Sequence, residues 1–139
     1  MSRAARRALL VALTGLACGA AGRVPATVRG YEILIPGRDT LSRALAGAFA
    51  RAGLDVRRTP RGGARAVAAL VVYEFRAPGR GGRAWLYGRL FDARSGRVVA
   101  AAALPGDSLP RAARERARQL VTALLQPADS GESRDAPIE

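Results

Sequence analysis

The chain has 139 residues, a length that accommodates one domain with little surplus. Its formal net charge is +12, so its surface attracts anionic lipid headgroups, anionic glycolipid or nucleic acid. It contains no histidine and one cysteine, which excludes Ser-His-Asp and Cys-His catalysis, imidazole metal ligation and an intrachain disulfide.

The first 17 residues have the features of an export signal. Three arginines and no acid precede an apolar run from Ala8 to Ala17, which is too short to span a bilayer. The run ends in TGLAC, which resembles a bacterial lipobox with Gly15 where leucine is usual. We therefore predict that residues 1–17 are a signal peptide and that Cys18 carries a lipid. The alternatives are a secreted domain cleaved near Ala20 or Ala21 and an uncleaved cytosolic chain.

The residues around the cysteine also predict where the mature protein lies. Gly19 after the cysteine resembles lipoproteins sent on to the outer membrane, so we expect an outer-membrane lipoprotein that faces the periplasm. Its membrane contact would be the lipid on Cys18. Residues 18–27 are expected to be a tether and residues 28–126 an α+β domain. Residues 127–139 hold four acids and one arginine and are expected to be a disordered acidic tail.

The first part of the domain predicts a strand, a helix and a short strand. Val28 to Ile35 alternates into a strand that ends at a Pro-Gly pair. Asp39 is a helix N-cap, and apolar side chains then recur at helical spacing until Gly53 ends the helix. This apolar stripe is expected to pack on the sheet. Leu54 to Arg57 is the short second strand.

Three consecutive antiparallel strands form the centre of the predicted sheet. They span Val67 to Arg76, Arg83 to Asp92 and Arg97 to Leu104, and they are rich in residues that favour strands. The segment APGRGG separates the first two strands, and DARSG turns the chain into the third. In that turn Gly96 can adopt the positive φ that a tight hairpin needs, and Asp92 can bond the turn amides.

The register of the second hairpin separates two faces of the central strand. It predicts the pairs Phe91–Val98, Arg89–Ala100, Gly88–Ala101 and Tyr87–Ala102. Because Gly88 leaves room for a close approach, we expect the helices on the face that it shares with Leu86 and Leu90. The opposite face carries Trp85, Tyr87, Arg89 and Phe91. We interpret these four as partner-binding residues, because aromatic and arginine anchors concentrate at interfaces; the alternative is that aromatic residues simply favour strands.

A last helix follows the sheet. A Pro-Gly pair ends the third strand, and Asp107 or Ser108 is expected to cap a helix that holds Pro110 in its first turn. Its apolar side includes Leu120 and Leu124. Its other side is basic, which indicates ordinary solvation or, alternatively, contact with anionic lipid.

The predicted elements make an α+β two-layer sandwich. Their order is β-α-β-β-β-β-α, with a mostly antiparallel sheet and both helices on one of its faces.

Two stretches resemble known bacterial envelope proteins. The strand-turn-strand LYGRLFDARSGRVV, followed by the helix ARERARQLVTALL, resembles the TolB N-terminal domain and lipoproteins of the LpoB, CsgG and FlgO type. The front half, with LSRAL opening a helix that leads into GLDV, is similar to the lipopolysaccharide-assembly lipoprotein LptE. The resemblance implies a non-enzymatic accessory role for a protein that is anchored by Cys18 and contacts an envelope protein complex or lipopolysaccharide.

No combination of residues predicts catalysis. Glu74 and Asp92 have no second carboxylate nearby in sequence, and the two Gly-rich segments lack the helix start of a phosphate-binding loop. We therefore predict that the protein is not an enzyme, has no catalytic or metal-binding residues, and uses no cofactor.

The leading hypothesis is a lipid-anchored accessory protein of a larger envelope assembly. One alternative is an LptE-like component of lipopolysaccharide transport. The other is a cytosolic basic protein that binds nucleic acid, if the signal is not cleaved. Nucleic acid is not the expected partner, because the arginines are scattered and no RNA- or DNA-binding signature is present.

Overall fold

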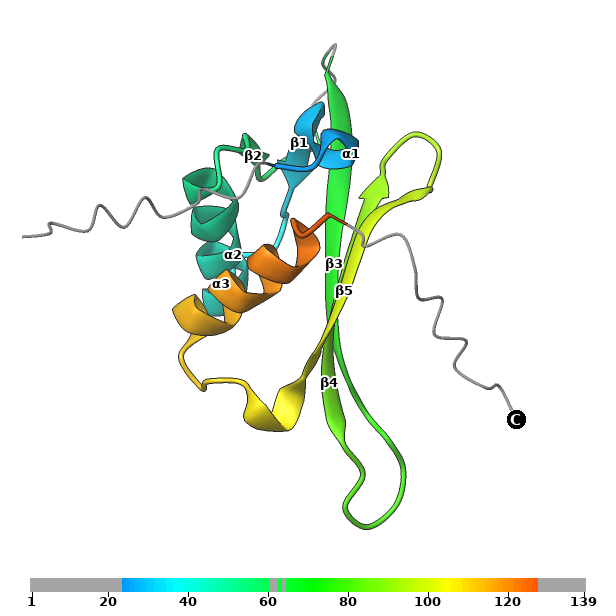
Figure 1. Cartoon of the computed structure of the whole chain (residues 1–139). Coiled ribbons are helices and arrows are strands. Elements are labelled where there is room, and N and C mark those ends of the chain that lie inside the picture. Colours follow the sequence, from blue (N-terminus) through cyan, green and yellow to red (C-terminus); the bar gives the residue numbers. More distant parts are fainter. Residues whose placement is uncertain (1–23, 61–62, 64, 128–139) are drawn as a thin grey trace, which may run out of the picture.

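The computed structural model of the chain describes residues 24–60, 63 and 65–127. Five strands form one sheet in the order β2-β1-β3-β4-β5, and the two longer helices lie together on one of its faces (Figure 1). The elements in chain order are α1 (Ala26–Arg29), β1 (Tyr31–Leu34), α2 (Thr40–Arg51), β2 (Val56–Arg57), β3 (Ala66–Arg76), β4 (Ala84–Asp92), β5 (Val98–Pro105), the 3-10 turn η1 (Gly106–Ser108) and α3 (Ala113–Leu124). The predicted two-layer α+β architecture is confirmed. The order along the chain differs from the predicted one by the additional α1 and η1.

The start of the first predicted strand is wrong. A single helical turn, α1, occupies the place where the strand was expected to begin, and β1 starts only at Tyr31. Pro25 has a φ of −55°, close to the helical value, and its carbonyl accepts the amide of Val28 at 3.0 Å. Val28 is fully buried, and Val24 packs against the same core. The folded body therefore includes Val24, which lies ahead of the predicted boundary at Val28.

Both ends of α2 agree with the sequence prediction. The Asp39 side chain accepts the backbone amide of Ser42 at 2.9 Å, which satisfies one of the free amides of the first turn. At the other end Gly53 has a φ of +88°, the left-handed conformation that favours glycine after a helix. The apolar stripe between them buries Leu45, Ala48 and Phe49.

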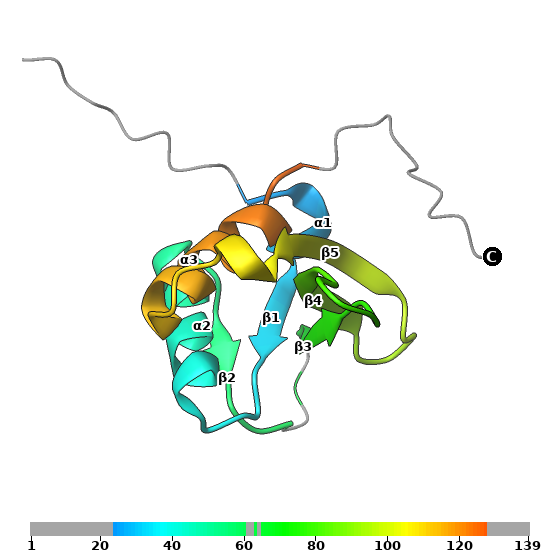
Figure 2. The same ribbon diagram turned by 90° about the horizontal axis from the view of Figure 1, so that it is seen from below.

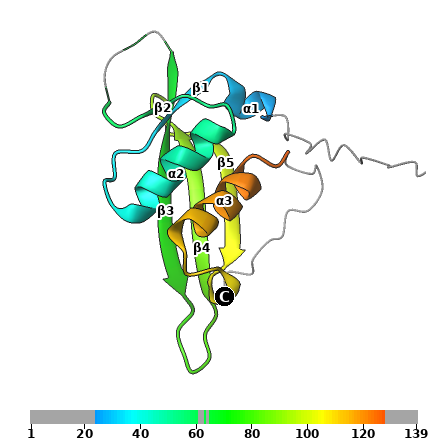
Figure 3. The ribbon, with the colours of Figure 1, turned by 90° about the vertical axis from the view of Figure 1, so that its left-hand side faces the viewer.

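β1 lies between β2 and β3 and runs parallel to both, whereas β3, β4 and β5 are antiparallel. β1 has four residues and β3 has eleven, so β1 pairs only with Ala66–Ala69 of β3. The remainder of β3 is paired only with β4 among the described strands. Figure 3 shows this lower part of β3 extending past the helices.

The predicted register of the second hairpin is correct next to the turn and wrong beyond it. Phe91 pairs with Val98, as predicted. An irregularity between Leu90 and Phe91 then shifts the register by one residue. The corrected pairs are Arg89–Ala101, Gly88–Ala102 and Tyr87–Ala103.

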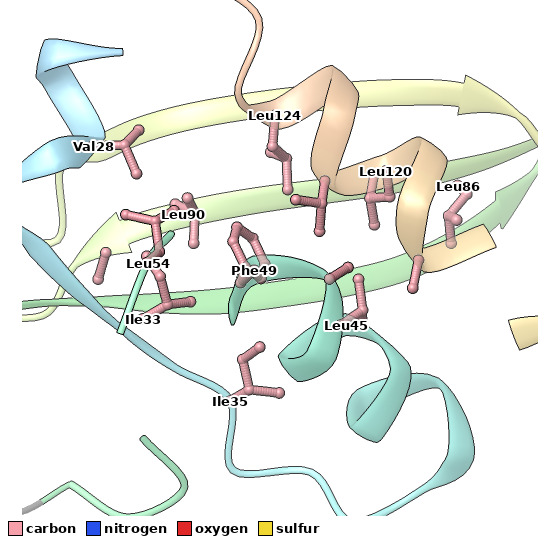
Figure 4. Packing of buried hydrophobic residues seen from close by; sticks show 14 residues of the cluster. Val28, Ile33, Ile35, Leu45, Phe49, Leu54, Leu86, Leu90, Leu120 and Leu124 are labelled. Carbon is pink, nitrogen blue, oxygen red and sulfur yellow. The ribbon is translucent and has the colours of Figure 1, made fainter. Parts of the chain in front are cut away.

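The helices cover the predicted face of β4. Leu86 and Leu90 are fully buried between the sheet and the helices, together with Phe49 of α2 (Figure 4). Leu120 of α3 lies directly above Gly88. A Cβ atom at Gly88 would be 3.0 Å from Leu120 Cδ1. The close approach that we expected from the glycine is therefore present.

The predicted cap of the last helix is wrong. Asp107 and Ser108 lie in η1, and α3 begins only at Ala113 without a side-chain cap. The Asp107 carboxylate instead accepts the backbone amide of Ala84 at 3.0 Å and pairs with Arg76 at 3.5 Å. It therefore fixes the start of β4 and not the start of a helix.

The contact between α3 and β4 predicts the effect of adding one methyl group. In Gly88→Ala the new Cβ would press on Leu120, which is fully buried and has little freedom to move. Overpacking of this kind costs about 1–3 kcal/mol, and the lower entropy of the unfolded alanine chain returns at most about 1 kcal/mol. We expect a net loss of unfolding free energy in urea titrations. Gly30→Ala is the matched control. Apart from the two residues next to Gly30 in the chain, no atom lies within 4 Å of the position that the new methyl group would occupy. Equal stability of the two variants would contradict this packing.

Candidate partner-binding face

The face of the sheet opposite the helices carries most of the aromatic residues. We call this the outer face and define it by alternate residues of β3 and β4: Val71, Tyr73, Phe75, Trp85, Tyr87, Arg89 and Phe91. Five of the seven aromatic residues of the chain belong to it. Viewed along the strands, both α2 and α3 lie on the other side of the sheet, and no described helix covers the outer face (Figure 2).

The four residues predicted from β4 lie on this face together. Arg89 is exposed, and the three aromatic side chains beside it are half-buried. The sequence reasoning missed the contribution of β3, whose Val71, Tyr73 and Phe75 are 45%, 40% and 51% exposed. The alternation of these residues along β3, combined with the register of the first hairpin, is the signal that could have found them.

Cross-strand pairs join the two rows into one surface. Phe75 lies opposite Trp85, and Tyr73 lies opposite Tyr87. The two tyrosine rings stack with centroids 5.0 Å apart and an interplanar angle of 11°. Such pairs stabilise a sheet and hold large side chains in fixed positions. The outer face is therefore a preformed apolar surface.

The only charged side chain within the outer face is positive. Arg89 lies opposite Val71, and no described acidic side chain pairs with it. Further along the same side of the sheet, Arg57 and Glu32 form an ion pair of 3.2 Å. An exposed patch of large apolar residues is uncommon on a monomeric protein, and aromatic residues with arginine are typical of binding surfaces. The arrangement suits contact with a partner that is apolar and partly anionic.

The carboxylates considered in the sequence have structural partners. Glu74 pairs with Arg116 of α3, and Asp92 accepts the hydroxyl of Tyr31 at 2.7 Å. In the described part of the chain, no three carboxylate or thiol side chains cluster as metal ligands would. The partners of Glu74 and Asp92 are thus an arginine and a tyrosine, and neither carboxylate is paired with a second acid for acid-base chemistry.

Asp92 holds the turn at one end of the outer face. Besides the Tyr31 hydroxyl, its carboxylate accepts the amides of Arg94 at 2.8 Å and Ser95 at 3.0 Å. The hydroxyl of Tyr31, followed by these two amides, lowers the pKa of Asp92 to about 2, because each bond favours the ionised form. The same bond raises the pKa of Tyr31. Gly96 completes the turn with a φ of +70°, as predicted.

The lowered pKa of Asp92 predicts acid sensitivity that depends on Tyr31. The bonds stabilise the fold above the unfolded pKa of about 3.9 and are lost as the pH falls towards 2. Tyr31→Phe removes the main cause, so the pKa of Asp92 should rise towards its ordinary value. Between pH 4 and pH 2 the wild-type chain should then lose more unfolding free energy than Tyr31→Phe. Urea titrations at several pH values measure this, with Tyr73→Phe as the control that should follow wild type. Parallel pH profiles for all three chains would refute the assignment.

Cys18 and residues 128–139 lie outside the described residues, so the predictions of a lipid anchor and of a disordered tail remain predictions. No helix in the described part of the chain combines the length and the apolar character needed to cross a membrane. Comparison of the chain with protein-family models, curated proteins and solved structures found no match.

Proposed function

We propose that the protein is a lipid-anchored, non-enzymatic accessory protein that binds a larger assembly of the bacterial cell envelope through its outer face. The observation that carries the proposal is the placement of five aromatic residues on the one sheet face that the helices leave open. Packing rules would put such residues inside a small domain, where they would stabilise it most. Their exposure is better explained by a partner that covers them.

The arginine in this face supports a second candidate function. Arg89 lies among aromatic residues, and a guanidinium group binds phosphate well. An LptE-like component that contacts lipopolysaccharide would use the same surface. Co-purification with a large β-barrel protein would favour this second function over the first.

The lipid anchor predicts a modification that depends on one residue. In a bacterial host grown with labelled palmitate, the wild-type chain should incorporate the label and fractionate with the membrane. Cys18→Ser removes the only thiol, so it should lose both properties. Ala20→Ser, which keeps the thiol and changes a neighbouring residue, should behave as wild type. Equal membrane association of Cys18→Ser would contradict the anchor.

The partner contact predicts a face-specific cross-link. A photoreactive amino acid at Tyr87 should cross-link to one partner in living cells, because this position lies within the outer face. The same amino acid at Thr122, which is exposed on α3, should give none. Arg89→Ala should weaken the cross-link from Tyr87. If Thr122 captured the same partner as efficiently, the outer face would not be the contact surface.

A further inference from the structure

One length of β3 has no neighbouring strand on the side away from β4. β1 pairs with β3 only as far as Ala69, whereas β3 continues to Arg76. We call this side of residues 70–76 the open edge. None of the described strands pairs along it.

Two hydrogen bonds fix the direction of the backbone groups along β3. The amide of Ala77 donates to the carbonyl of Arg83 at 3.1 Å, and the amide of Ala93 donates to the carbonyl of Val67 at 2.9 Å. These bonds flank the β3–β4 ladder at its two ends. Because bonded and non-bonded pairs alternate along antiparallel strands, the odd-numbered residues of β3 point their amides and carbonyls towards β4.

The even-numbered residues therefore point their backbone groups the other way. Val72 and Glu74 each direct one amide and one carbonyl into the open edge, and no described residue bonds to them there. An unpaired row of this kind is a template for a further strand. Proteins usually protect such edges with charge or proline. Along the open edge the only charged residue before Arg76 is Glu74, and its carboxylate forms an ion pair with Arg116 of α3.

The open edge is apolar on its outer side, and on its helix side it is apolar at Leu70 and Val72. On the helix side, a pocket of about 340 Å³ lies between β3 and the start of α2, and its lining includes Leu41, Leu45, Leu70 and Val72. On the outer side lie Val71, Tyr73 and Phe75, three of the four large apolar residues that are most exposed in the described chain. A strand along the open edge would place alternate side chains in the pocket and against these residues.

The charges around the open edge indicate what kind of strand it accepts. Near one end Arg38 is adjacent to Asp39, an acid that itself lines the pocket, whereas Arg80 and Arg83 lie in the loop that follows the other end. None of the three has an acidic partner among the described residues. A second copy of the chain would add to the positive charge, because residues 18–139 have a formal net charge of +9, which is +12 less the three arginines of residues 1–17. A segment with acidic residues at the end that lies near Arg80 and Arg83 is electrostatically complementary.

We propose that the open edge of β3 binds an extended segment of the partner protein, which adds to the sheet as a sixth strand. This inference rests on the proposed function and specifies how the partner binds. The segment is apolar at alternate positions, so that its side chains fill the pocket and cover Val71, Tyr73 and Phe75. It carries carboxylates at the end that lies near Arg80 and Arg83. The main-chain bonds to Val72 and Glu74 supply affinity, and the pocket supplies selectivity.

The test uses the purified full chain with Cys18→Ser and a displayed library of random dodecapeptides. Selection should enrich peptides that have apolar residues at alternate positions and acids at one end. A synthetic copy of an enriched peptide should protect the amides of Val72 and Glu74 from hydrogen exchange, as measured by NMR. Val72→Pro removes one amide that points into the open edge, and it should weaken binding about tenfold or more. Ala103→Pro, at the free side of β5, is the matched control and should bind as wild type.

A second measurement leaves the protein unchanged, in case Val72→Pro does not fold. Backbone N-methylation of the peptide should abolish binding at alternate positions only, because only every second residue faces the open edge. The inference would be overturned if selection enriched no peptide, or if a bound peptide protected amides other than those of Val72 and Glu74. It would also be overturned if neither Val72→Pro nor N-methylation of the peptide changed binding. A stable dimer of the chain in light scattering with the Val72 amide already protected would overturn it too, since a second copy would then occupy the edge.

Failure of this inference differs from failure of the proposed function. If Val72→Pro leaves the in-cell cross-link from Tyr87 intact, the partner binds the outer face without adding a strand. If the cross-link itself is absent while peptides still bind the open edge, the strand site exists but the outer-face contact does not.

Discussion

Two helices can cover only one face of a five-stranded sheet, and this constraint decides how the whole chain is arranged. The close contact between Leu120 and Gly88 brings α3 down onto β4, and α2 packs beside it. The fully buried side chains Phe49, Leu86 and Leu90 lie in the layer between the helices and the sheet. Apart from the single turn α1, whose Val28 is buried in the core, the described residues contain no further α-helix that could cover the second face. Whatever lies on that face is therefore exposed until something else covers it.

The outer face and the open edge meet in the same part of β3. β1 is short and β3 is long, so the sheet ends unevenly and leaves part of β3 bare. The bare part is also the part that carries the most exposed aromatic side chains. A surface with both unpaired backbone groups and unburied apolar side chains is a liability for an isolated protein. The proposed partner would remove both liabilities with one contact.

The sequence predicted most elements of this fold because the signals for them are local. The cap at Asp39, the left-handed Gly53 and the turn at Asp92 all depend on residues within a few positions of one another. The close approach of a helix at Gly88 could also be predicted, because a strand residue without a side chain leaves room for a neighbouring element. These features needed no knowledge of how distant segments pair.

The features that the sequence did not predict depend on contacts between distant segments. The one-residue shift between Leu90 and Phe91 lies within the β4–β5 pairing, and a register extended from the turn alone does not include it. Asp107 looked like a helix cap, but it bonds to Ala84 at the start of β4. The insertion of β1 between β2 and β3 likewise joins segments that are far apart in the chain. The contribution of β3 to the outer face is different, because the alternation along β3 and the register of the first hairpin could have predicted it.

The single tryptophan of the chain lies within the outer face, opposite Phe75, and is only half-buried. Indole fluorescence from this protein therefore comes from one known place. Its emission wavelength and its quenching by iodide would report directly on whether that surface is wet or covered, without any attached dye. The molecule thus carries its own optical reporter at the position where a partner is proposed to bind.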